Sequence, residues 1–156
     1  AESLLTFHWC SIVLPDDDLV ATSKAMDELR VQIGELEEAL LQEGIPPHFR
    51  AYASGLLESL KRAMFLFPVQ GLAPFKDTVR KAVVDANFDA EDINRELSAV
   101  ADKPQVRSLK EKLGRALTTT AKTVGEIEKF GKGAGYLIGK GSQVFEFLAQ
   151  AKDALG

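Results

Sequence analysis

Cysteine, histidine and tryptophan are scarce in this chain of 156 residues. Cys10 is the single cysteine, so no disulfide can form within the chain and no multi-cysteine zinc site can be assembled. His8 and His48 are the two histidines, and no pattern joins them to Cys10 as a nucleophile and its base. We therefore expect a protein that is not an enzyme, needs no cofactor and resides in a reducing, intracellular compartment, the cytoplasm.

Long apolar runs are also missing. No stretch approaches the roughly eighteen uncharged apolar residues that a membrane-spanning helix needs. Residues 1–15 are apolar in part, but they open with Glu2 and lack the basic flank and small residues of a signal peptide. Their spacing suits a strand or a helix; we prefer a helix, because no second strand is predicted to pair with it. We expect an N-terminal arm over residues 1–15.

Helical periodicity dominates the rest of the chain. Over residues 17–43 the apolar positions alternate steps of three and four, as in a heptad pattern. Gly44 and two prolines end this helix, and a second one follows until Pro68 stops it. A third helix is predicted over residues 74–87. The inward residues of the first helix are Leu19, Thr22, Met26, Leu29, Ile33, Leu36 and Leu40.

A fourth helix is predicted after Asp89, through residue 101. Asp89 is placed to cap it, with Asp92 at the capping-box position. Phe88 and Ile93 have the spacing of a hydrophobic staple. The sequence thus predicts a side-chain cap and an apolar contact at this helix start.

Glycines recur every four residues near the C-terminus, at Gly131, Gly135 and Gly139. Such spacing lets two helices approach closely, and Lys132 and Lys140 make the segment basic. Apolar and basic residues keep opposite helical faces from Pro104 onward, so we expect one amphipathic helix over residues 104–150, kinked or broken between Gly131 and Gly141.

The expected fold is an all-α, single-domain bundle of about six to seven helices over residues 1–156, with two long amphipathic helices. The long members are the heptad helix and the basic glycine-zipper segment, residues 104–153. Residues 16–43 carry nine acids and two bases, a net charge of −7; residues 103–140 carry nine bases and three acids, a net charge of +6. We expect these segments to pack together; a basic surface kept for an anionic partner is the alternative.

One acidic stretch resembles the EF-hand calcium loop over twelve residues. Asp85, Asn87, Asp89 and Glu96 fall at ligand positions of that loop. Ala90 stands where the loop needs glycine, and Asp92 stands at its apolar position. A helix cap with solvated acids is therefore the preferred interpretation, and no metal is expected. The glycine cluster likewise fails the phosphate-loop pattern, because no serine or threonine follows Lys140.

A role in binding is the remaining expectation. We predict a helical interaction module, an adaptor, inhibitor or regulatory subunit, that contacts a protein partner through the acidic face of the heptad helix and through Met64, Phe65, Phe67 and Leu72. The alternative is a bundle that binds or permeabilises an anionic membrane surface through Gly131, Gly135, Gly139, Lys132 and Lys140. Homo-oligomerisation is open. A pI near 5.3 and a lysine stripe without interleaved aromatic residues argue against nucleic acid.

Overall fold

The computed structural model describes residues 16–125 and residue 132, with side-chain surroundings from residue 22 onward. All regular structure in this part of the chain is helical, which confirms the all-α class. Residues 16–125 form five helices, so the expected total of six to seven is not confirmed. The helices are α2 (Asp16–Leu40), α3 (Pro47–Gln70), α4 (Ala73–Phe88), α5 (Ala90–Ala99) and α6 (Pro104–Thr123).

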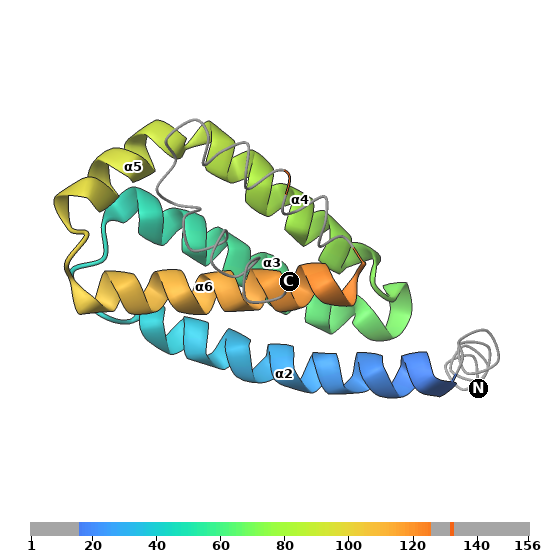
Figure 1. The fold of residues 1–156 in the computed structure, drawn as a ribbon. Helices are drawn as coiled ribbons and strands as arrows, with labels where there is room; N and C mark the ends of the chain where they lie inside the picture. The colour runs from blue at the N-terminus through green and yellow to red at the C-terminus, as the bar shows by residue number, and fades with distance from the viewer. Residues whose placement is uncertain (1–15, 126–131, 133–156) are drawn as a thin grey trace.

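Helix α2 confirms the heptad prediction wherever its side chains are described. Its apolar positions from Met26 to Leu40 are buried at steps of three and four. It runs antiparallel to α6, and the two helices pack extensively (Figure 1). The chain then turns at Gly44, which has a φ of +82°.

Pro68 does not stop the second helix, contrary to the prediction. Helix α3 continues through Pro68 to Gln70 and ends at Gly71, which has a φ of +61°. A proline removes its own N–H donor, but the next turn can still form when its other donors find carbonyls. Here the N–H of Gly71 donates to the carbonyl of Phe67 at 2.9 Å. The proline therefore interrupts one bond without ending the helix.

The predicted cap and staple at the start of α5 are also wrong. The Asp89 side chain makes no capping hydrogen bond, and Phe88 is 87% exposed, away from buried Ile93. The backbone of Asp89 instead stays in a turn conformation that continues the helical bonding from α4 to α5. Its N–H donates to the carbonyl of Asp85, and its carbonyl accepts from Ile93, both at 3.0 Å. The backbone groups of Asp89, and not its side chain, therefore make the hydrogen bonds at the start of α5.

Helix α6 is shorter than the predicted basic helix. It ends at Thr123, and Gly125 has a φ of +70°, which lies outside right-handed helical geometry. The helix expected from Pro104, with its kink or break placed at Gly131 or beyond, therefore ends earlier than predicted. The break expected between Gly131 and Gly141 lies outside the described residues.

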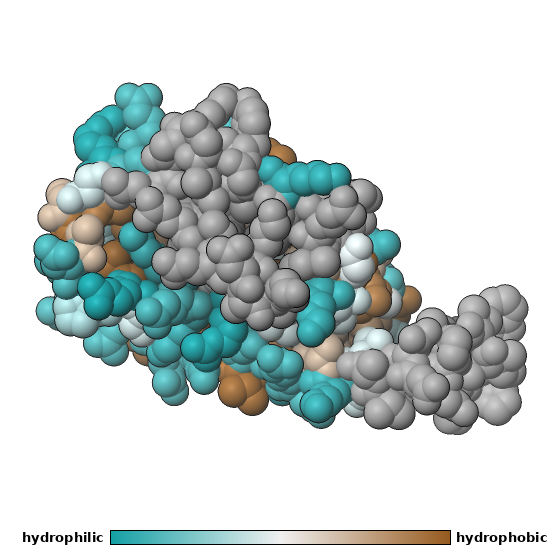
Figure 2. Space-filling view, in the orientation of Figure 1, coloured by the Kyte–Doolittle hydropathy of each residue, from teal (hydrophilic) through white to brown (hydrophobic). Residues whose placement is uncertain are grey.

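The core forms around α6, which packs on α2 and α4 (Figure 1). Helix α3 closes the bundle by packing on α2, α4 and α5. Figure 2 shows a described surface that is mostly hydrophilic, with apolar side chains in small separate patches. The largest fully buried side chains are Phe49, Phe75, Leu29, Leu36, Leu56, Leu60, Ile93, Leu97, Leu109, Leu113 and Leu117.

The acidic and basic segments do pack together, as expected. Arg115 on α6 pairs with Glu35 on α2 at 3.2 Å. Deeper in the same contact, the buried amide of Gln32 donates to the hydroxyl of Thr119 at 3.0 Å, while its Oε1 accepts no hydrogen bond. The contact between α2 and α6 is therefore apolar with one incompletely satisfied polar side chain inside it.

Gly44 and Gly34 provide a matched test of this fold. A Cβ on Gly44 would lie 2.9 Å from Nε2 of Gln105, on a backbone with positive φ, whereas a Cβ on Gly34 in α2 would meet nothing within 4 Å. We expect Gly44→Ala to lower the free energy of unfolding by about 1–2 kcal/mol and Gly34→Ala to raise it by about 0.5–1 kcal/mol. Urea unfolding of both variants measures this; equal effects would contradict the assigned turn.

Candidate functional site

Two apolar side chains stand in solvent near the end of α3. Phe65 is 82% exposed and Val69 is 80% exposed, and they lie one helical turn apart on one face. Met64, Phe67 and Leu72, predicted with Phe65 as contact residues, instead pack partly buried against the core. Phe67 also makes an edge-to-face contact with the ring of Phe75, with centroids 6.2 Å apart. Of the four predicted residues, Phe65 alone is available as a surface contact.

The exposed pair belongs to a row that runs along the outward face of α3. Its members are spaced by four, three, four, three and four residues, so they share one helical face. We call this row the outer stripe. Its residues are Ala51, Gly55, Glu58, Arg62, Phe65 and Val69. The sequence carries this second periodicity, but it is weaker than the buried one because small and charged residues fill four of its six positions.

Among the described residues, the charged side chains near the outer stripe form ion pairs, whereas the two charged side chains within the stripe do not. Lys61 on α3 pairs with Glu37 on α2 at 2.6 Å, and the hydrogen bond to that carboxylate raises the pKa of Lys61. Glu35 is likewise engaged by Arg115, so part of the acidic face of α2 serves contacts within the chain. In the described residues, Glu58 and Arg62 form no ion pair. Both are exposed.

A polar cluster joins the start of α3 to α5. The carboxylate of Glu96 accepts hydrogen bonds from the backbone N–H groups of His48, at 3.0 Å, and Phe49, at 3.2 Å. These donors lie in the first turn of α3, where no intrahelical acceptor exists. The ring Nδ1 of His48 lies 2.6 Å from Oε1 of Glu96, and its Nε2 lies 3.9 Å from Asp92. Glu96 is therefore a helix cap supplied by another helix.

The same contacts set the protonation behaviour of the cluster. The hydrogen bond to Glu96 raises the pKa of His48, aided by the negative charges of Glu96, Asp92 and Asp89 against partial desolvation. Partial desolvation pushes the pKa of Glu96 upward, but the hydrogen bonds from the ring and backbone of His48 and from Phe49 together lower it. Imidazolium and carboxylate thus stabilise each other.

The EF-hand-like residues do not form a metal site. Asp85 pairs with Lys81, Glu96 caps α3, and Asp85 and Asn87 lie within α4 instead of in a loop. Asp89 follows that helix directly. Within the described residues, no group of three or more histidine, cysteine, aspartate or glutamate side chains is placed to hold a metal ion. The EF-hand loop is not formed, because Asp85 and Asn87 lie in α4 and Glu96 lies in α5, so helices separate residues that a loop would gather.

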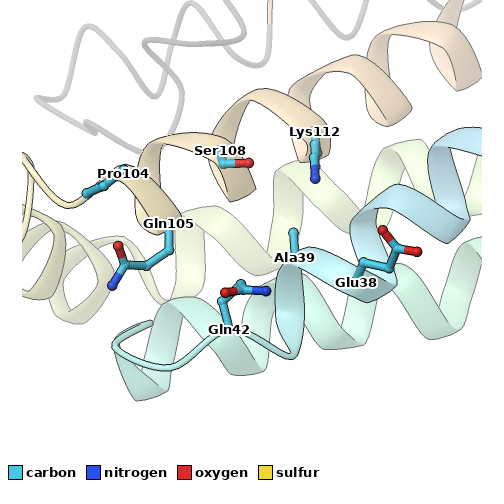
Figure 3. A pocket seen from close by; sticks show the side chains of 7 residues that line it. All are labelled: Glu38, Ala39, Gln42, Pro104, Gln105, Ser108 and Lys112. Carbon is cyan, nitrogen blue, oxygen red and sulfur yellow. The ribbon is translucent and has the colours of Figure 1, made fainter.

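A polar pocket of about 420 Å³ lies between the end of α2 and the start of α6 (Figure 3). Small Ala39 lies on its α2 side, and longer side chains surround it. Lys112 points from α6 toward α2, where Glu38 lies at the same end (Figure 3). The lining residues are Glu38, Ala39, Gln42, Pro104, Gln105, Ser108 and Lys112. Ser108 and Lys112 lie one helical turn apart in this lining, and no described hydrogen bond joins the Ser108 hydroxyl to Lys112 or to Glu38.

The predicted glycine zipper falls mainly outside the described residues. Gly131, Gly135, Gly139 and Lys140 lie there, as do His8 and Cys10; Lys132 is described, with a helical backbone and an exposed side chain. Among the described helices, none combines the length and apolar character that crossing a membrane requires. The membrane-surface role therefore stays a prediction from sequence.

Comparison with known proteins supplies no family for this chain. No protein-family model matches it, and neither a curated protein nor a solved structure is similar to it at a level that indicates relationship.

The cluster of His48 and Glu96 predicts a pH-dependent stability. A raised histidine pKa gives stability that is complete below the ordinary value of 6.5 and is lost as pH rises through the raised pKa. A lowered glutamate pKa gives stability that is complete above the ordinary value of 4.5 and is lost as pH falls through the lowered pKa. We expect His48→Gln to destabilise the protein most between these two values, measured by urea unfolding across the pH range. A loss independent of pH would contradict this assignment.

Proposed function

We propose that the protein is a non-enzymatic helical interaction module that binds another protein through the outer stripe of α3. The observation that carries this proposal is the exposure of Phe65 and Val69 on one face. When a partner covers two large apolar side chains that lie one turn apart in water, their burial stabilises the complex by about 25 cal/mol per Å² of apolar surface. The acidic face of α2 enters the proposal only beside this stripe, since Glu35 and Glu37 are engaged within the chain.

The support behind the stripe favours recognition over chemistry. Directly inward of the exposed pair, Met64 and Phe67 pack on the core and fix the helix that presents it. A contact surface on a packed helix loses little conformational freedom when it binds. Several polar side chains of the described residues, among them Glu96, Lys61 and Arg115, are by contrast engaged in capping and ion pairing within the chain. A cytoplasmic location remains part of the proposal and depends on the lone cysteine.

Photo-crosslinking tests this proposal directly. A photoreactive phenylalanine analogue placed at Val69 should form protein adducts in an extract of the producing cell, while the same analogue at exposed Glu111 on α6 should not. Phe65→Ala should reduce the adducts from position 69 by about fivefold or more, because burying a phenylalanine contributes about 1.5–3 kcal/mol. Equal labelling from both positions, or no dependence on Phe65, would overturn the proposal.

Phe67→Ala is the matched control for folding. Its ring contacts Phe75 and the core, so we expect a loss of about 1–3 kcal/mol in the free energy of unfolding, whereas Phe65→Ala should change it by less than about 0.5 kcal/mol. Thermal or urea unfolding of the two variants distinguishes a core aromatic residue from a contact residue. Equal losses would show that Phe65 is not free at the surface.

A further inference from the structure

We propose that the partner of the outer stripe is a second copy of this chain, bound with its α3 antiparallel to the first. This inference rests on the proposed function, because it names the partner of that same surface. Two copies related by a two-fold axis must present the same surface to each other. When the two helices are antiparallel, residues near one end of the stripe therefore have to fit residues near its other end. The outer stripe meets this requirement.

The residues of the stripe lie nearly in line along the helix. At 100° per residue, the alternating steps of four and three keep all six positions within about 40° of one direction. From Ala51 to Val69 the stripe is about 27 Å long at 1.5 Å per residue. Such spacing is the one by which paired helices interdigitate over several turns.

Reversing the stripe about its centre places large residues against small ones. With the axis midway between Glu58 and Arg62, Phe65 of one copy faces Gly55 of the other, and Val69 faces Ala51. Among the described residues, a Cβ on Gly55 would meet nothing within 4 Å, so this part of the chain leaves space over the glycine for the ring of a partner. Large side chains opposite small ones let the two helix backbones approach closely.

The central charges then fix the direction of pairing. In the antiparallel arrangement, Glu58 of each copy faces Arg62 of the other, which gives two opposite-charge contacts by symmetry. In a parallel arrangement, Glu58 of one chain would face Glu58 of the other, and Arg62 would face Arg62. Both contacts would then be repulsive. In the described residues neither side chain forms an ion pair, although the charge of Glu58 helps to raise the pKa of nearby Lys61, and both side chains are exposed to a partner across the axis.

One pair of helices buries a small interface. Dimers of this size bind weakly, on the order of micromolar Kd, so the association has to be measured over a range of concentrations. Sedimentation velocity of the full chain from about 1 to about 500 µM covers that range. We expect a monomer–dimer equilibrium that Phe65→Ala weakens by about tenfold or more.

A charge swap tests the register and the direction together. Glu58→Arg and Arg62→Glu should each weaken dimerisation by about tenfold or more, since each variant replaces two attractions by two repulsions. The double variant restores opposite charges across the axis and should return the Kd to near that of the original chain. Rescue by the second substitution excludes misfolding as the cause of the first loss.

The outcomes separate this inference from the proposed function. Loss in both single variants with rescue in the double variant supports the antiparallel dimer. A dimer indifferent to all three variants uses another face and overturns the inference, as does a monomer at every concentration. The chain can also prove monomeric while crosslinks from position 69 still depend on Phe65. In that case the crosslinked partner is a different protein, and the proposed function stands without the dimer. If these crosslinks are also absent, both proposals fail.

Discussion

The apolar contact between α2 and α6 is the constraint on which the rest of the fold depends. One face of α6 is buried along the helix against α2 and α4, with Leu109, Leu113 and Leu117 fully inside the core. Each such leucine contributes about 1.5–3 kcal/mol, whereas an exposed ion pair such as Glu35 with Arg115 contributes at most about 1 kcal/mol. The opposite charges of the two segments therefore favour their pairing, but burial of apolar surface holds them together.

Polar contacts inside the bundle specify arrangement more than they add stability. Glu96 ties α5 to the start of α3 by satisfying two backbone donors that would otherwise face only water. Gln32 reaches Thr119 across the α2–α6 contact but leaves one amide oxygen without a hydrogen bond, which costs free energy in a buried position. Such a side chain favours one relative placement of two helices that apolar residues alone would allow to slide.

Periodicity predicted the helices and their buried faces, because burial repeats at every turn and local sequence records it. Opposite net charges predicted the packing of α2 on α6, but individual side-chain contacts between distant segments left no such record. Glu96 lies far along the chain from His48, so nothing in the sequence near Glu96 indicates that it caps α3. Helix ends were the other failure: Pro68 suggested an end and Gly125 did not, whereas backbone hydrogen bonding carried α3 past the proline and positive φ at the glycine ended α6.

Helix α3 shows why the candidate site could be predicted only in part. The run from Met64 to Phe67 is apolar on every side, so sequence alone could not say which residues the core would take. The core takes Met64 and Phe67, since these continue the buried face of Phe49, Leu56 and Leu60. Of this run, Phe65 stays exposed, and it lies on the same helical face as Val69, Arg62 and Glu58. Helix α3 therefore has one face that the core accounts for and a second face on which Phe65 and Val69 stay exposed.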